Sequence, residues 1–340
     1  MTRATIKDIA AQSGLSTSTV DRTLNGRAGV SALNRYRVMQ AAQRLGYPAL
    51  LGTMPMPSRP VRIALLTPHL DRAFITLVAE TISTQAAKNP LVSSCRIIPI
   101  RSLSSEDLQH AVDALADVEA VAVIAKDTPQ NRGTINGLVG AGVQVVTLAT
   151  DLKGTTRAFY VGVDNHAAGR TAGRITRLLA AGKSGPVAVY AGSRAFLGQK
   201  QREDGFVNHL KADPDLLVLP TVETQEDSTA MQSAVTSQLR RTPNLAAIYC
   251  VGAGRRGIIE ALNGLRDRPV VVMHDLTDKS RHWMETGKID AIIDQNAQLV
   301  GEQAVQYMLG AIAGSRAAPG LKQVNPRLIL LENLPKRNVP

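Results

Sequence analysis

The stretch IYCVGAGRRGIIEAL (residues 248–262), followed by PVVVMHD (residues 269–275), has the order strand, glycine-rich turn, helix, strand. Gly252, Gly254 and Gly257 have the spacing G-x-G-x-x-G, and the second apolar run ends in an aspartate. This order predicts a βαβ unit with parallel strands. The same spacing occurs in dinucleotide-binding turns, where an acidic residue about 20 positions further on holds a ribose hydroxyl. An NAD-dependent enzyme is therefore one reading of the stretch.

The same alternation of short apolar runs and helical patterns extends over the chain from Val61 onward. The runs are VRIALL (61–66), RIIPI (96–100), AVAVIA (120–125), VQVVTL (143–148), FYVGV (159–163), PVAVYA (186–191), LLVLP (216–220), AAIYCV (246–251), PVVVM (269–273) and DAIID (290–294). Their length and β-branched composition are typical of buried parallel strands with crossover helices. About ten such units exceed one small sheet, so we predict two doubly wound parallel-sheet lobes. A ligand is expected in the cleft at the carboxyl ends of the strands.

The net charge of +11 is concentrated near the N-terminus. Residues 1–59 hold eight Lys or Arg against two Asp, a net charge of +6, whereas the other 281 residues hold 31 basic and 26 acidic side chains. A basic head on a nearly balanced body favours a polyanion as the partner of the head. No apolar run approaches the roughly 20 residues of a membrane span, and no apolar signal region follows the start, so we expect a cytoplasmic protein. The two cysteines and six histidines lack metal-ligand spacing, which predicts no metal site.

The stretch TIKDIAAQSGLSTSTVDRTLNG (5–26) has the pattern of two short helices joined by a tight turn. Thr5 is placed to cap the first helix, with Asp8 three residues later in a capping box, and Ser16 is placed to cap the second. A third amphipathic helix is expected over about 31–45. Three short helices, the second rich in hydroxyl groups, predict an all-α helix-turn-helix head.

The residues of this segment also match a known sequence pattern. ATIKDIAAQSGLSTSTVDRTLNGRAGVS (4–31) resembles the DNA-binding domain of the lactose/galactose repressor family, with the frame T-x-x-D-[IV]-A, G-[LV]-S-x-x-T-V, L-N and V-S matched almost throughout. The resemblance implies a DNA-binding domain over residues 1–47. It places Thr17, Ser18 and Arg22 at base-reading positions, where arginine can donate two bonds to guanine and hydroxyls can meet bases. The residues it places against phosphates, which set register, are Thr5, Ser16, Thr19 and Asn25.

Residues 48–60 form a proline-rich linker with Pro48, Pro55, Pro57 and Pro60. This spacing cannot sustain a helix across 55–60 and predicts an extended, partly stiff connector. Many members of the resembled family have here a hinge helix of the form P-N-x-x-A-R-x-L, whose leucine enters the minor groove. That motif is absent, and Leu50 or Leu51 would have to take its place.

Five segments of the body resemble the sugar-binding effector domain of the same family and periplasmic sugar-binding proteins of the ribose-binding type. They are VTLATDL (146–152), YVGVDNHAAGRTAG (160–173), QREDGF (201–206), VMHDLT (272–277) and IIDQNAQLVGEQAVQ (292–306). The resemblance implies a two-lobed effector domain over 61–340. The implied division is an N-lobe of about 61–162 and 297–323, a C-lobe of about 163–296 and 324–340, and hinges near 161–164, 294–297 and 322–326.

The resemblance also assigns seven residues to the ligand cleft: Asp71, Phe74, Asp151, Arg202, Gly252, Asp275 and Gln295. Carboxylates and an arginine suit adjacent sugar hydroxyls, and an aromatic face suits the C–H side of a sugar ring. A lone aspartate at a strand end is also a common helix cap, and a phenylalanine on a helix is commonly core. Those are the structural alternatives for these positions.

We therefore predict a DNA-binding transcriptional regulator, a repressor that binds a palindromic operator as a homodimer and responds to a small sugar or polyol, with no cofactor. A solute-binding transport component is the first alternative, which the basic head disfavours. An enzyme that uses Gly252, Gly254 and Gly257 for NAD is the second. No other phosphate-binding element accompanies these glycines, and the aspartate at position 275 suits a sugar equally well.

Overall fold

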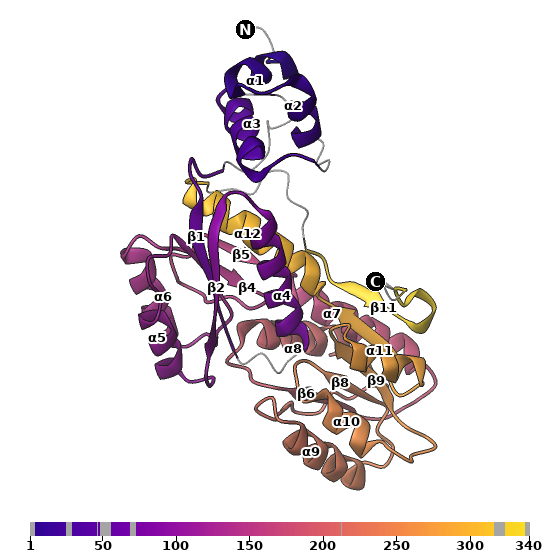
Figure 1. The fold of residues 1–340 in the computed structure, drawn as a ribbon. Helices are drawn as coiled ribbons and strands as arrows, with labels where there is room; N and C mark the ends of the chain where they lie inside the picture. The colour runs from indigo at the N-terminus through magenta and orange to yellow at the C-terminus, as the bar shows by residue number, and fades with distance from the viewer. Residues whose placement is uncertain are drawn as a thin grey trace.

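The computed structural model describes residues 4–24, 29–45, 47, 56–68, 73–211, 213–315 and 324–336. A three-helix head stands at one end of a body made of two α/β lobes (Figure 1). This is the predicted fold class: an all-α head with two doubly wound lobes. The predictions for Asn25, for Asp71 and for most of the linker, including Leu50 and Leu51, lie outside the described residues.

The head consists of α1 (Ile6–Ser13), α2 (Thr17–Leu24) and α3 (Ala32–Arg44), so its three predicted helices are confirmed. The capping box at the start of α1 is present: the Asp8 N–H donates to the Thr5 hydroxyl over 3.4 Å, and the Thr5 N–H donates to the Asp8 carboxylate over 2.8 Å. The small core consists of Ile9, Ala10, Val20, Val38, Ala41 and Ala42. Local capping and one apolar stripe per helix thus account for this domain.

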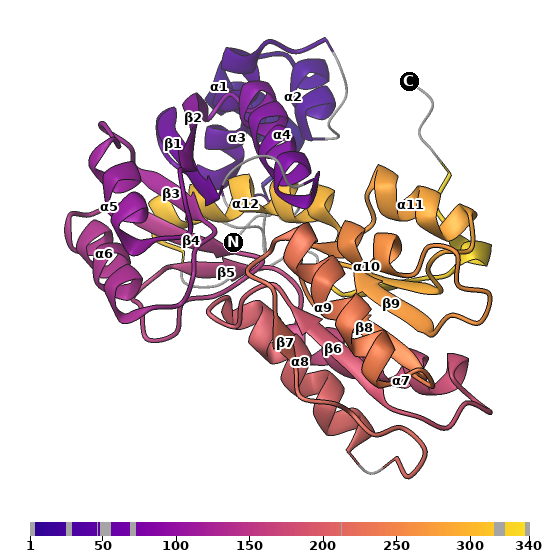
Figure 2. The ribbon, with the colours of Figure 1, turned by 90° about the horizontal axis from the view of Figure 1, so that it is seen from below.

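The N-lobe is built on a sheet in the order β2-β1-β3-β4-β5, with every pairing parallel. Its strands are β1 (Val61–Pro68), β2 (Val92–Ile100), β3 (Ala120–Val123), β4 (Gln144–Leu148) and β5 (Phe159–Val161). Two helices cover each face: α4 (Ala73–Lys88) with α12 (Ala297–Ile312), and α5 (Ser105–Asp113) with α6 (Pro129–Gly140) (Figure 2). The late position of α12 in the chain shows that the lobe is completed by a returning segment.

The C-lobe sheet has the order β11-β10-β9-β8-β6-β7, and β11 runs antiparallel to β10. Its strands are β6 (Val187–Ala191), β7 (Val222–Glu223), β8 (Ala247–Cys250), β9 (Val270–His274), β10 (Ala291–Asp294) and β11 (Arg327–Ile329). One face is covered by α7 (Asn165–Leu179) and α8 (Leu197–Leu210), the other by α9 (Ser228–Arg241), α10 (Arg255–Ala261) and α11 (Asp278–Glu285), and η2 (Leu331–Asn333) follows β11.

One predicted strand is wrong in its bounds. Of the run LLVLP at 216–220, the structure pairs Val218 alone, in an isolated bridge to Val187, and the edge strand β7 begins later, at Val222. Leu217 in the run is 68% exposed, because this segment lies at the edge of the sheet, where neither a second neighbour nor a covering helix buries it.

The chain crosses between the lobes where the ligand cleft forms. β5 pairs with β4 in the N-lobe, and α7 packs on C-lobe strands, so the first crossing lies at 162–164. The second lies at 295–296, between β10 of the C-lobe and α12 of the N-lobe, and a third lies between α12 and β11 of the C-lobe. Buried residues of both lobes join in one core, to which Val163 and Ala297 beside the first and second crossings belong. The crossings are therefore anchored by packing on both sides.

Candidate functional site

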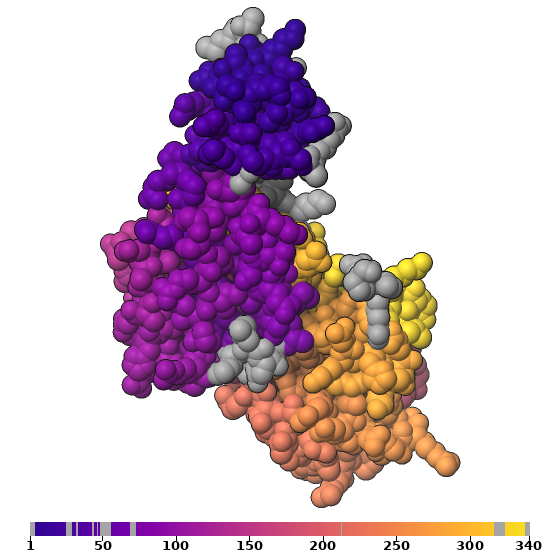
Figure 3. All heavy atoms as spheres, in the orientation of Figure 1, coloured from indigo at the N-terminus to yellow at the C-terminus, as the bar shows by residue number. Residues whose placement is uncertain are grey.

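The second helix of the head exposes the residues that the sequence assigns to DNA bases. Thr17, Ser18 and Arg22 are exposed on α2, whereas Val20 is buried in the head core. Ser16 caps this helix: the Thr19 N–H donates to its hydroxyl over 3.2 Å. Figure 3 shows the head seated against the N-lobe and away from the C-lobe. The exposed hydroxyls and the arginine therefore lie outside the core of the head.

A cavity of about 100 Å³ lies between the lobes, where several parallel strands end. Its walls consist of Phe74, Ile75, Ile124, Ala149, Thr150, Phe196, Gly198, Gln199, Arg202, Glu226, Gly252, Ala253, Arg255, Asp275 and Gln295. Five of the seven predicted ligand residues are in this set. The second crossing also borders it, through Gln295.

Arg202, on α8, is the most fully engaged side chain of the cavity wall. It is 5% exposed, and its Nε donates to Asn165 Oδ1 over 2.7 Å, its Nη1 to the Val251 carbonyl over 3.2 Å, and its Nη2 to Gln295 Oε1. A buried guanidinium is costly unless acceptors surround it, and these three come from separate segments. The side chain is therefore held in one orientation at the cavity.

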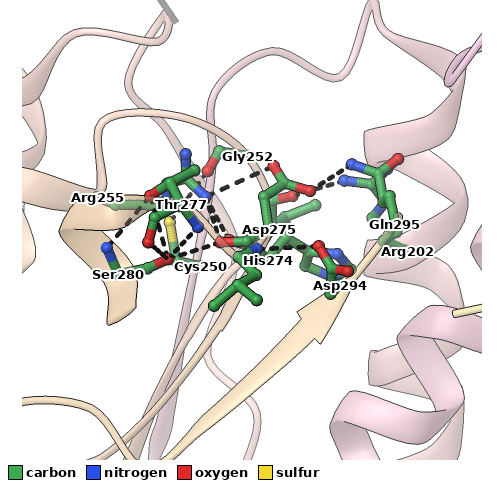
Figure 4. A network of polar contacts seen from close by, with 12 residues as sticks. Arg202, Cys250, Gly252, Arg255, His274, Asp275, Thr277, Ser280, Asp294 and Gln295 are labelled. Carbon is green, nitrogen blue, oxygen red and sulfur yellow. Dashed lines mark hydrogen bonds and ion pairs between the residues drawn. The ribbon is translucent and has the colours of Figure 1, made fainter. Parts of the chain in front are cut away.

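Asp275 follows β9 and completes a chain of polar contacts with Gln295 (Figure 4). Gln295 Nε2 donates to Asp275 Oδ1 over 2.6 Å, while Arg255 Nη1 lies 3.5 Å from Asp275 Oδ2. Arg255 also donates to the carbonyl of His274. Asp275 has φ 66°, a left-handed backbone conformation that is uncommon outside glycine. Strain of this kind persists where surrounding contacts fix a side chain in a functional position.

Five polar or aromatic wall residues had not been predicted: Thr150, Phe196, Gln199, Glu226 and Arg255. Gln199 Oε1 accepts from the backbone N–H groups of Gly192 and Ser193 over 2.9 and 3.2 Å, which directs its Nε2 to the Glu226 carboxylate. The sequence signal was the GSR loop (192–194) before α8 together with a long loop before α9, but nothing local indicates that the two loops meet.

His274, the last residue of β9, lies beneath this wall. It is fully buried, with its Nε2 2.8 Å from the Tyr249 hydroxyl. Burial, and then the positive charges of Arg202 and Arg255, hold its pKa well below 6.5. The imidazole is therefore neutral, and it adds no positive charge to the two arginines above it.

Asp151 is the predicted ligand residue that the structure places elsewhere. It does not line the cavity; its carboxylate accepts from Arg157 Nε over 2.6 Å and from the Thr147 hydroxyl over 2.7 Å. Burial raises its pKa, but the hydrogen bonds from Arg157 and Thr147 outweigh that effect and hold the pKa below its usual value. The ion pair accounts for this carboxylate within the N-lobe.

The three glycines of the opening stretch each have a packing role. A Cβ on Gly252 would lie 2.3 Å from Gln199 Oε1, and one on Gly257 would lie 2.1 Å from the Ser228 carbonyl of the neighbouring α9. Gly254 has φ 85° at the start of α10, a left-handed conformation that glycine adopts without strain. The spacing G-x-G-x-x-G is thus explained by the cavity wall and by the contact between α9 and α10.

The described residues offer little support for a metal site, a nucleophilic cysteine or a membrane span. Among the described residues, no group of three or more His, Cys, Asp or Glu side chains is arranged to hold a metal ion. Cys95 and Cys250 are free thiols, and burial raises their pKa values to about 11 and about 12, so neither is a ready nucleophile. No helix in the described ranges has the length and apolar character needed to cross a bilayer.

A two-lobed body with a polar cavity between the lobes, joined to a helix-turn-helix head, defines a ligand-binding protein with a DNA-binding domain. Comparison with protein families supports this class of protein. Residues 63–316 match the periplasmic binding protein domain, and residues 5–49 match the bacterial regulatory proteins of the lacI family. The chain therefore belongs to the periplasmic binding protein domain family, and its N-terminal head is a DNA-binding domain of the lacI family of bacterial regulatory proteins.

Individual relatives are distant. The chain is 25% identical to the HTH-type transcriptional regulator MalR of Streptomyces coelicolor, over 96% of this chain and 95% of that protein. It is 24% identical to the D-allose-binding periplasmic protein of Escherichia coli, over 47% of this chain and 52% of that protein. A solute-binding protein of Burkholderia graminis, solved with D-arabinose, has a TM-score of 0.75 at 20% identity and covers 82% of this chain and 98% of its own. This last likeness concerns the fold.

Proposed function

We propose that the protein is a repressor whose affinity for operator DNA is set by a neutral monosaccharide or polyol bound between the lobes. The head, residues 1–47, binds DNA; residues 48–60 form the linker; residues 61–340 form the effector domain. Regulators among its relatives, rather than enzymes, support a role without catalysis or a cofactor. A DNA partner places the protein in the cytoplasm.

The observation that carries this proposal is the row Arg202, Gln295, Asp275 and Arg255 along one wall of the cavity. Donors and acceptors alternate in this row, and adjacent sugar hydroxyls offer the same alternation. Two arginines face two carboxylates, Asp275 and Glu226, so the wall is near electroneutral and suits an uncharged ligand.

The cavity volume sets the size of the ligand. One water-sized group needs roughly 10–15 Å³ of such space, so 100 Å³ has room for a monosaccharide-sized molecule rather than a peptide or a dinucleotide. Phe74 and Phe196 supply aromatic surface for the C–H side of a ring. Sugars bound by the relatives from Escherichia coli and Burkholderia graminis are of this size.

A thermal-shift screen of the full chain tests the ligand class. A panel of D-allose, D-arabinose, D-ribose and myo-inositol should contain at least one compound that stabilises the protein, by about 2.7 kcal/mol at a hundredfold excess over Kd. A sugar phosphate and NADH are the comparison ligands. Stabilisation by NADH or by the sugar phosphate alone would contradict the proposal.

A binding assay with operator DNA tests the head and the homodimer. A twofold-symmetric dimer should prefer an inverted repeat, recovered by selection from random duplexes. Arg22→Ala should cost about 1–3 kcal/mol on the selected site and relax base preference at one position in each half-site. An equal loss on random DNA would assign Arg22 to phosphate contact instead.

A further inference from the structure

The guanidinium of Arg202 holds side chains from the first and second crossings between the lobes. Asn165, bonded over 2.7 Å, is the first residue of α7, directly after the first crossing. Gln295, bonded to Nη2, is the residue that follows β10 at the second crossing. One buried side chain of the cavity wall thus connects two segments that lie far apart in the sequence.

Asn165 continues this connection into the first crossing. Its Nδ2 donates to the Tyr160 hydroxyl over 3.0 Å and lies 3.3 Å from the Ala149 carbonyl, and the Tyr160 hydroxyl in turn donates to the Val163 carbonyl over 3.0 Å. Ala149 and Tyr160 belong to the N-lobe side, whereas Arg202 belongs to the C-lobe. Asn165 is 3% exposed, so water does not compete for these bonds.

The helices that carry Asn165 and Arg202 form one rigid pair. A Cβ on Gly169 of α7 would lie 2.1 Å from the Arg202 carbonyl, and a Cβ on Gly205 of α8 would lie 2.3 Å from the His166 carbonyl. The two backbones therefore touch, and the bond between Asn165 and Arg202 stays within one body. Relative motion of the lobes must change the bonds from Asn165 to the N-lobe instead.

Arg202 also has donors left for a ligand. Of its five N–H groups, three are used by Asn165, Val251 and Gln295, and within the described residues one N–H on each terminal nitrogen has no protein acceptor. Both nitrogens belong to a residue that lines the cavity. A ligand oxygen that accepts from these two N–H groups would satisfy the remaining donors of the guanidinium. The bonds from Arg202 to Asn165 and Gln295 would stay in place.

We propose that Asn165 is a positioning residue that couples Arg202, and through it the ligand, to the crossing between the lobes. A ligand oxygen on Arg202 holds the guanidinium in the orientation that bonds Asn165 and Gln295 together, and so holds both crossings in the closed arrangement. The part played by the ligand rests on the proposed function; the connection from Arg202 to the crossings exists without it.

Hydrogen exchange of the full chain, without ligand, tests the connection. Asn165→Ala should speed amide exchange in residues 158–165 about tenfold or more, because the bonds that are lost stabilise this segment against local opening. Arg202→Ala should speed exchange at both 158–165 and 294–298. In the double variant, exchange at 158–165 should be no faster than in Asn165→Ala alone. Arg194→Ala is the matched control, since that arginine pairs with Glu203 and not with a crossing.

Two further variants separate positioning from general packing. Asn165→Asp keeps an acceptor for Arg202 but loses the donor to Tyr160, so it should loosen 158–165 and leave 294–298 protected. Tyr160→Phe should do the same. Unchanged exchange at 158–165 in Asn165→Ala would overturn the proposal, and so would an equal rise in β8 and β9, which would assign Asn165 to overall stability.

A last arm adds D-allose as the probe. If it protects 158–165 and 294–298 in the wild type, Asn165→Ala should lose the protection at 158–165 while it retains D-allose binding in calorimetry within about tenfold. Retained protection at 158–165 in this variant would overturn the coupling. A wild type that ignores D-allose counts against this sugar under the proposed function and leaves the exchange result without ligand intact.

Discussion

The two walls of the cavity differ in chemistry. The C-lobe wall carries nearly all the charged and amide groups, namely Gln199, Arg202, Glu226, Arg255 and Asp275, with Gln295 at the crossing, whereas the N-lobe wall carries Phe74, Ile75, Ile124, Ala149 and the hydroxyl of Thr150. Under the proposed function, we therefore expect the C-lobe wall to select and orient the ligand and the N-lobe wall to cover it and exclude water. The walls also meet directly, since the Gly198 N–H donates to the Thr150 hydroxyl over 3.0 Å.

The largest effect should come from the centre of the C-lobe wall. Arg202→Ala leaves Gln295 and Asn165 without their buried donor and removes the ligand's charged partner, so we expect a loss of about 2–5 kcal/mol in sugar affinity. Isothermal titration with the sugar that gives the largest thermal shift measures it. Arg194→Ala, on the same lobe, should bind like the wild type. Equal affinities for all three proteins would remove Arg202 from the site.

A smaller loss is expected when the charge of Asp275 is removed but its shape is kept. Asp275→Asn weakens hydrogen bonds to a charged acceptor, which are worth about 1.5–3 kcal/mol. The same titration should show reduced affinity, while the DNA head still binds its operator as the wild type does. A variant that releases DNA normally at the wild-type sugar concentration would show that the carboxylate does not touch the ligand.

Stability should depend on pH through the C-lobe. His274 is buried and neutral with a pKa well below 6.5, whereas in the unfolded chain it takes up a proton near pH 6.5. The unfolded state therefore binds more protons below that pH, and the free energy of unfolding should fall by up to about 1.4 kcal/mol for each pH unit. Above pH 6.5 the contribution of His274 is complete. Urea unfolding of the wild type and of His274→Gln should show a flatter profile in the variant.

The N-lobe wall should contribute least. Phe74 is half-buried, and Phe74→Ala should lower sugar affinity by only about 1 kcal/mol through lost ring contact. Leu77→Ala, one turn later on α4 and 41% exposed, is the control and should leave affinity unchanged. A loss as large as that of Arg202→Ala would mean that both walls select the ligand and would abolish the contrast between them.

The sequence by itself determined the elements whose signals are local. The caps at Thr5 and Ser16 and the apolar stripes of the head are each encoded within a few residues, and all are present. The alternating runs of the body predicted two parallel-sheet lobes for the same reason. The resemblance to a known family also identified Arg202 and Asp275, because the sequence motifs around them are distinctive.

Only the tertiary structure decided which side chains meet. Arg202 bonds partners 37 and 93 residues away, and Gln199 meets Glu226 27 residues further along the chain. Asp151, assigned to the ligand by the resemblance, pairs with Arg157 and is not among the residues that line the cavity. No local pattern encodes such choices, because they depend on how two lobes and their crossings bring distant loops to one cavity, where burial makes every unpaired polar group costly.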